Sequence, residues 1–131
     1  MKFKTIKQVV TIDAGPDEVY QAYVDPKKHE EFTGSPATGT SRVGGRFTAW
    51  DGYISGKWLE LEKGERIVHE WTTTEWPDGY PPSVVEIELK AKGGRTELMI
   101  LHRKAPAEQA KMYAEGWIEY YWEPMKEMLE K

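Results

Sequence analysis

Residues Ala107–Lys131 read AEQAKMYAEGWIEYYWEPMKEMLEK and carry the clearest structural signal of this chain. Apolar side chains recur there at helical spacing and give a predicted helix one broad apolar stripe, formed by Ala110, Tyr113, Trp117, Tyr120, Tyr121 and Met128. A helix over Ala107–Glu130 would be about 36 Å long at ~1.5 Å per residue. Because the stripe is unusually aromatic, the helix needs a large, curved apolar surface to pack against.

The residues before this helix predict that surface. Alternating segments separated by glycine-containing turns indicate an antiparallel meander, with strands expected at Phe3–Ile12, Arg46–Trp50, Tyr53–Glu62, Glu65–Thr74, Ser83–Lys92 and Arg95–Arg103. Gly56 inside one strand predicts a bulge. Within the last strands we expect an inward face formed by Ile67, His69, Trp71, Thr73, Val85, Ile87, Leu89, Ala91, Leu98, Ile100 and His102.

Two short helices are predicted between the first and second strands. Pro16 followed by acidic residues is typical of a helix start, and Asp25-Pro26 predicts the cap of a second helix that runs through Phe32. The order of elements is therefore one strand, two short helices, a meander and a long helix. This order predicts an α+β helix-grip fold, in which a curved antiparallel sheet wraps around the C-terminal helix.

Length and composition limit the possible functions. With 131 residues, we expect a single domain over 1–131. The net charge of −4 is unlike the basic face of a nucleic-acid-binding protein, and Lys2, Lys4 and Lys7 are typical of a charged strand edge. The absence of cysteine excludes disulfides and thiolate chemistry and agrees with a reducing cytoplasm. We also expect no signal peptide and no membrane partner, because no apolar run has the required length.

Two histidines are candidate functional residues, because period-2 counting places His69 and His102 on apolar strand faces. One interpretation is that either ring anchors a ligand or acts as an acid or base. The alternative is that both are core histidines whose nitrogens are satisfied by neighbouring hydroxyls or carbonyls. His29 lies in a charged segment, where we expect it to be solvated.

A set of bulky rings predicts a cavity between sheet and helix. Such rings pack imperfectly against a concave sheet, although they could also fill the core outright. Pro124 removes one backbone donor from the helix and predicts a kink. Together with His69 and His102, the candidate lining residues are Trp50, Trp58, Trp71, Tyr113, Trp117, Tyr120 and Tyr121.

The chain contains neither a metal-binding motif nor a nucleotide-binding motif, and no catalytic triad is visible. We therefore expect no cofactor, no metal and no catalytic residues. With only histidine as a titratable group, a cavity of this kind would bind and orient a molecule without turning it over.

A series of short motifs resembles one known family, the C-terminal domain of activators of the ninety-kilodalton heat-shock chaperone ATPase (Aha type). The motifs, in chain order, are Phe32–Ala37, Gly44–Phe47, Asp51-Gly52, Ser55-Gly56, Ile67–Trp71, Trp76–Gly79, Thr96–Leu98 and Gly116–Tyr121. The resemblance implies the START/Bet v-like helix-grip fold, and it implies no catalytic residue set.

Three functional hypotheses follow. The first is a non-enzymatic domain that binds a small hydrophobic ligand in the cavity. The second, implied by the resemblance, is a co-chaperone module that binds a ninety-kilodalton heat-shock chaperone. The third is a cyclase-like or hydrolase-like enzyme, and it ranks last because no acid/base pair is visible.

Overall fold

The structure, a computed structural model, describes residues 1–130. It begins with β1 (Phe3–Ile12), α1 (Pro16–Val24) and α2 (Pro26–Thr33). The meander then comprises β2 (Thr38–Gly39), β3 (Arg46–Ala49), β4 (Ile54–Glu62), β5 (Arg66–Thr73), β6 (Ser83–Lys92) and β7 (Arg95–Pro106). The chain continues through α3 (Ala110–Trp117), a π-helical segment η1 (Ile118–Trp122) and α4 (Glu123–Leu129).

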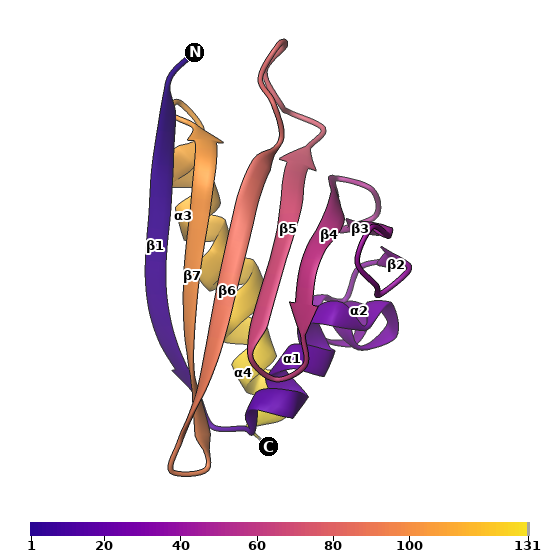
Figure 1. The fold of residues 1–131 in the computed structure, drawn as a ribbon, viewed down its shortest axis with the longest axis vertical. Coiled ribbons are helices and arrows are strands. Elements are labelled where there is room, and N and C mark those ends of the chain that lie inside the picture. The colour runs from indigo at the N-terminus through magenta and orange to yellow at the C-terminus, as the bar shows by residue number, and fades with distance from the viewer. Residues whose placement is uncertain (131) are drawn as a thin grey trace.

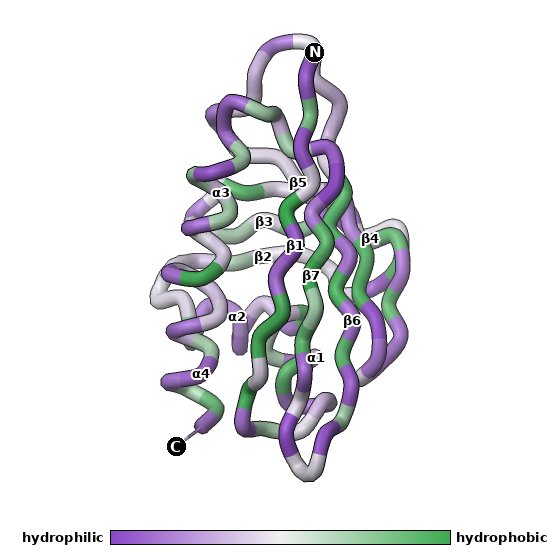
Figure 2. Tube along the Cα trace, turned by 90° about the vertical axis from the view of Figure 1, so that its left-hand side faces the viewer, coloured by the Kyte–Doolittle hydropathy of each residue, from purple (hydrophilic) through white to green (hydrophobic). Residues whose placement is uncertain are grey.

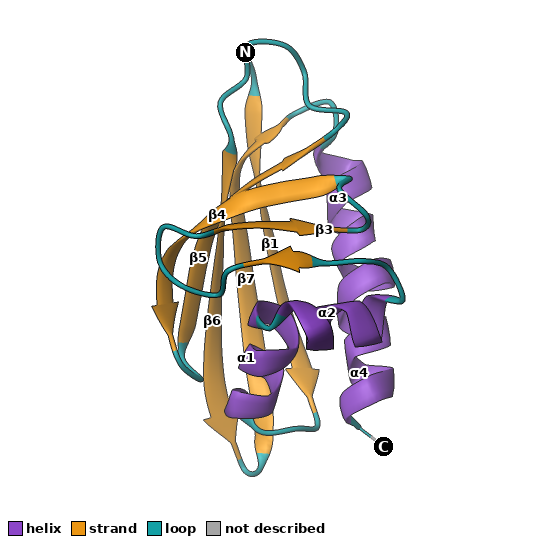
Figure 3. Cartoon of the chain, turned by 90° about the vertical axis from the view of Figure 1, so that its right-hand side faces the viewer, coloured by secondary structure: helices purple, strands orange, loops and turns teal. Residues whose placement is uncertain are grey.

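All seven strands form one antiparallel sheet in the order β1-β7-β6-β5-β4-β3-β2. Figure 1 shows the C-terminal helix crossing one face of this sheet, with α1 and α2 near its lower end. Figure 3 shows the short strands β2 and β3 reaching round toward that helix. The sheet is therefore concave on the helix side, which confirms the predicted α+β helix-grip fold.

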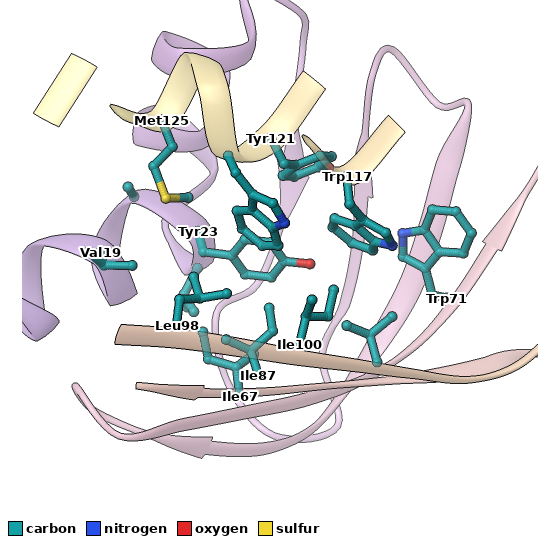
Figure 4. Close-up of a cluster of buried hydrophobic side chains, with 14 of the residues drawn as sticks. Val19, Tyr23, Ile67, Trp71, Ile87, Leu98, Ile100, Trp117, Tyr121 and Met125 are labelled. Carbon is teal, nitrogen blue, oxygen red and sulfur yellow. The ribbon is translucent and has the colours of Figure 1, made fainter. Parts of the chain in front are cut away.

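The alternation along β6 and β7 sets the two faces of the sheet, and Figure 2 shows it as alternating green and purple segments. On the inner face, the predicted residues Val85, Ile87, Leu89, Leu98 and Ile100 are buried. Of these, Ile87, Leu98 and Ile100 lie beneath Trp117, Tyr121 and Met125 from the helix (Figure 4). The predicted inward register is confirmed for these five residues.

The outer face of the sheet carries charged side chains. Arg66 on β5 forms ion pairs with Glu60, Glu86 and Glu88 on its neighbouring strands. Glu86 also pairs with Arg103. These contacts hold Glu86 and Glu88 on the face opposite the helix, as the register requires.

Two details of the strands differ from the prediction. Ala91 was expected to face inward but is exposed, because the tip of the β6–β7 hairpin extends beyond the elements that cover the sheet (Figure 1). The predicted bulge at Gly56 is also wrong: Gly56 pairs in register with Trp71, and the extra residue is Leu59, between Trp58 and Glu60.

Gly56 instead lies where the neighbouring strands approach closely and leave no room for a side chain. A Cβ built on it would lie 2.0 Å from the carbonyl oxygen of Glu70 and 2.5 Å from the ring of Phe47. We expect Gly56→Ala to lower the free energy of unfolding by about 2–3 kcal/mol, since overpacking costs roughly 1–3 kcal/mol and a strand carbonyl cannot rotate away. Urea unfolding would measure this change. Gly15→Ala, whose Cβ would meet only the Glu18 side chain at 3.7 Å, is the control and should cost less.

The C-terminal helix begins later than predicted, at Ala110 rather than Ala107. The amide of Ala107 donates to the carbonyl of Lys2, so this residue extends the pairing of β7 with β1. Gln109 then forms the cap position before Ala110. Within residues 1–130, no helix has both the length and the apolar character that crossing a membrane requires.

Pro124 was predicted to kink the helix, and a π-helical segment, Ile118–Trp122, comes just before this proline. The amide of Glu123 donates to the carbonyl of Ile118, five residues earlier, immediately before the proline that lacks an amide hydrogen. The wider turn lets two consecutive rings, Tyr121 and Trp122, both lie buried against the sheet side, while Tyr120 stays half exposed.

Candidate functional site

An open cavity of about 440 Å³ lies between the concave side of the sheet and the C-terminal helix. Trp71 from β5 and Trp117 from the helix both line it, and their ring centroids lie 5.7 Å apart. Six of the candidate residues line it: Trp50, Trp71, Tyr113, Trp117, Tyr120 and Tyr121. Figure 4 shows Trp71 from β5 beside Trp117 from the helix, with Tyr121 on the other side of Trp117.

Four further lining residues were missed by the sequence analysis, namely Tyr53, Ile54, Met112 and Gly116. Gly116 lies three residues after Tyr113 and four before Tyr120, so helical spacing could have placed it on the lined face. Tyr53 and Ile54 follow the Asp51-Gly52 turn, and no periodicity in the sequence shows that this turn reaches the helix.

The mouth of the cavity is formed by side chains that are only partly covered. Met112 and Tyr120 are 45% and 51% exposed. Across from them, the ring of Trp50 meets the ring of Tyr120 edge to face, at 5.5 Å between centroids and an interplanar angle of 73°. The cavity therefore opens to solvent between the helix and the turn that joins β3 to β4.

That turn holds Trp50 in an unusual backbone conformation. Trp50 and Asp51 have φ angles of 53° and 55°, and Gly52 follows at 87°. Left-handed conformation costs a non-glycine residue roughly 1–2 kcal/mol. The conformation is stabilised by the amide of Asp51, which donates to the carbonyl of Pro36 at 2.9 Å. Backbone strain of this kind is often found where a side chain serves a site, and here it places the Trp50 ring at the cavity mouth.

The other three candidates, Trp58, His69 and His102, do not line the cavity. Trp58 stacks on Phe47 at 4.4 Å between ring centroids. It borders a separate void of about 10 Å³, which is room for about one water molecule. Both histidines face the helix side of the sheet, as predicted, but both are fully buried among neighbouring side chains.

His102 belongs to a closed chain of hydrogen bonds. The indole Nε1 of Trp117 donates to His102 Nδ1 at 3.1 Å, which makes Nδ1 an acceptor. His102 Nε2 must then donate to Ser83 Oγ, 2.8 Å away, and Ser83 donates to the carbonyl of Trp71 at 2.7 Å. Because Nδ1 accepts a hydrogen bond, it carries no proton and His102 is neutral. The same hydrogen bond positions the Trp117 ring beside the cavity.

His69 and His29 form a second buried group around Tyr23. His69 Nδ1 lies 2.8 Å from the carbonyl of Glu70 and donates to it, so Nε2 accepts from the Tyr23 hydroxyl at 2.8 Å. His29 Nδ1 likewise donates to the Tyr23 carbonyl, and its Nε2 accepts from the Tyr121 hydroxyl at 3.0 Å.

The expectation that His29 is solvated is therefore wrong. The His29 ring is buried, because α2 turns back toward the helix and its Phe32 and Tyr121 neighbours enclose it. The charged residues beside it in sequence lie on the other faces of a short helix, where they remain exposed.

Burial keeps all three rings neutral. It lowers the pKa of His69 to about 4 and the pKa of His102 to about 3, because desolvation disfavours the charged imidazolium. It also lowers the pKa of His29. Desolvation raises the pKa of the Tyr121 hydroxyl, so this lining residue is protonated as well.

The cavity wall offers few groups for chemistry. Among the described residues that line it, none carries a formal charge. Within residues 1–130, the histidines bond to hydroxyls, an indole and backbone carbonyls, and neither Glu70 nor Glu119 reaches one through its carboxylate. The same residues contain no group of three His, Cys, Asp or Glu side chains placed to hold a metal ion. This arrangement can enclose and orient a molecule.

Comparison with known proteins shows which family the chain belongs to. The family model described as "Activator of Hsp90 ATPase homolog 1-like protein" matches residues 13–130. The chain is 32% identical over 123 residues to the human "Activator of 90 kDa heat shock protein ATPase homolog 1", covering 94% of this chain and 36% of the human protein. It therefore spans about a third of the length of the curated relatives it matches.

Two solved structures show the same fold. An HSP90 activator from Plasmodium falciparum superposes with a TM-score of 0.89 at 23% identity, covering 96% of each chain. The Aha1 dimer from Colwellia psychrerythraea gives a TM-score of 0.83 at 16% identity, covering 97% of this chain and 96% of that one. Taken with the match over residues 13–130, these findings show that the chain belongs to the family of Activator of Hsp90 ATPase homolog 1-like proteins.

Proposed function

We propose that this domain binds a small apolar or amphipathic molecule in the cavity between β5 and the C-terminal helix, without turning it over. The observation that carries the proposal is an open cavity of about 440 Å³ whose wall is mostly aromatic. Ligand pockets typically measure about 300–1,000 Å³ and have mainly hydrophobic and aromatic walls. The wall residues provide no pair of ionisable groups that could divide acid and base roles.

Gly116 allows the cavity to be blocked without disturbing the core. A Cβ at this position would meet only the Tyr120 ring, at an ordinary 3.8 Å. We expect Gly116→Leu to fill the cavity and to abolish binding of N-phenyl-1-naphthylamine, a neutral fluorescent probe. Folding should be preserved, because glycine in a helix interior is about 1 kcal/mol less favourable than alanine and leucine is also a good helix former.

Gly116→Ala is the matched control, since it adds one methyl group and leaves most of the cavity open. It should keep probe binding and raise the free energy of unfolding by up to ~1 kcal/mol. If wild type and Gly116→Leu bound the probe equally well, the ligand site would lie elsewhere. If the wild type bound no member of a panel of apolar probes, the proposed function would be wrong.

A second candidate function is that of a cytoplasmic co-chaperone module, which is favoured by the family match and by the 32% identity to a human protein named as an activator of heat-shock protein ATPase. If this is correct, the domain should bind the middle domain of a ninety-kilodalton heat-shock chaperone and change its ATPase rate. Calorimetric titration and an ATPase assay with the intact chaperone test this directly. An unchanged rate together with no measurable binding would exclude the co-chaperone function for this chain.

A further inference from the structure

We propose that the cavity selects an organic cation, such as a quaternary or protonated amine attached to an apolar body. This inference rests on the proposed ligand-binding function and specifies the chemical class of the ligand. It is carried by the hydrogen-bond directions of the lining hydroxyls, by the arrangement of the lining rings and by one carboxylate behind the lining residue Tyr53.

Three of the four lining hydroxyls, those of Tyr53, Tyr113 and Tyr121, point their hydrogens away from a ligand. Tyr53 donates to Glu75 Oε1 at 2.5 Å, and Tyr113 donates to Gln109 Oε1 at 2.7 Å. Tyr121 donates to His29 Nε2, and the indole of Trp117 donates to His102. With these protons committed to protein acceptors, these three hydroxyls can offer a ligand only oxygen lone pairs, which attract positive charge and repel negative charge. The fourth hydroxyl belongs to Tyr120, which is half exposed at the mouth and can donate there.

Two further indole donors lie in the cavity wall, and that of Trp50 is directed to the Tyr121 hydroxyl. The indole Nε1 of Trp71 has no hydrogen-bond partner within residues 1–130, but this nitrogen is shut off from solvent. It therefore does not give the open part of the cavity a donor for a carboxylate or phosphate. An anionic ligand would lose its water shell and could gain a side-chain hydrogen bond only from the Tyr120 hydroxyl at the mouth.

The rings themselves favour a cation. Neighbouring walls stand nearly at right angles, at 84° between Trp71 and Tyr113 and at 73° between Trp50 and Tyr120. Such a box presents π surfaces in more than one direction. A cation within about 6 Å of an aromatic face gains roughly 0.5–2 kcal/mol, and tryptophan is the strongest partner.

Glu75 supplies the complementary charge. It is exposed and lies directly behind Tyr53, whose ring lines the cavity. No described lining residue carries an opposing positive charge. The whole chain, with a net charge of −4, also favours the approach of a cation.

A pair of isosteric molecules tests the inference. Benzyltrimethylammonium and neopentylbenzene have nearly the same shape and differ in a nitrogen cation against a neutral carbon. In displacement of N-phenyl-1-naphthylamine from the wild-type protein, we expect the cation to bind about tenfold more tightly, which corresponds to ~1.4 kcal/mol. Phenylacetate, an anion with a similar ring, should be the weakest competitor.

Glu75→Gln removes the negative charge of this side chain while keeping its size and shape. This variant keeps a hydrogen-bond acceptor for Tyr53 and should weaken binding of the cation about threefold, while binding of neopentylbenzene stays unchanged, as expected for a partly screened surface charge. Glu62→Gln is the control. Glu62 lies at the end of β4 opposite the lining residue Ile54, so the same charge change there should alter the binding of neither molecule.

The outcomes distinguish this inference from the proposed function. If the neutral isostere bound as tightly as the cation, the selection for cations would be wrong while the apolar site would stand. If neither the neutral probe nor either isostere bound, both proposals would fail.

Discussion

Replacing Trp117 with alanine is expected to lower the free energy of unfolding by about 3–5 kcal/mol, the usual loss for a buried large aromatic side chain. Trp117 is only 2% exposed and stacks on Trp122 at 5.6 Å with an interplanar angle of 13°. The substitution also removes the donor to His102 Nδ1, which leaves a buried acceptor without a partner. Urea unfolding monitored by circular dichroism would measure the loss.

Two control variants divide this effect into packing and hydrogen bonding. Trp117→Phe keeps a ring but removes the indole N–H, so it should cost about 1–3 kcal/mol for the unsatisfied histidine together with lost contacts. Met112→Ala, at the exposed mouth of the same cavity, should cost less than either. A loss below about 1 kcal/mol for Trp117→Ala would place Trp117 outside the core.

The sequence predicted the fold well because the fold depends on periodicity. The alternation in Ser83–Lys92 and the helical spacing from Ala110 onward each favour one face, and burial of these faces leaves few other arrangements. The prediction failed where local geometry depends on distant contacts. Ala107 could not start the helix because its amide pairs with Lys2, a residue far away in sequence.

The candidate site was predicted less completely, for two physical reasons. Whether a ring lines a cavity or fills the core depends on packing in three dimensions, so Trp58 and Trp50 could not be distinguished by pattern. The π-helical segment also changes the helical register after Ile118, so residues predicted from a regular helix rotate relative to the sheet. Gly116 was missed because a glycine has no side chain to count in an apolar stripe.

The buried histidines predict a steep loss of stability in mild acid. An unfolded histidine has a pKa of about 6.5. In the folded protein the pKa of His69 is lowered to about 4 and that of His102 to about 3. Between these values the unfolded chain binds protons that the folded chain does not, so the free energy of unfolding falls as the pH falls. The contribution is fully present above about pH 6.5.

The expected size follows from the linkage relation. Each such histidine lowers stability by up to ~1.4 kcal/mol per pH unit, so His69 and His102 together should remove about 4 kcal/mol between pH 6.5 and pH 4.5. The lowered pKa of His29 adds to this loss. Urea unfolding at several values between pH 5 and pH 6.5 measures the slope in a window where most glutamates and aspartates remain ionised.

Variants around His102 distinguish proton linkage from ordinary destabilisation. His102→Gln should lower the free energy of unfolding at pH 7. It should also reduce the number of protons taken up on unfolding between pH 5 and pH 6 by about one, since it removes a titrating group. Ser83→Ala removes the hydrogen-bond acceptor of His102 Nε2 but keeps the ring, so it should lower stability at each pH and preserve the slope. A wild-type protein with equal stability at pH 6.5 and pH 5 would mean that these histidines take up protons while folded, and the closed hydrogen-bond chain from Trp117 to Trp71 would then be wrong.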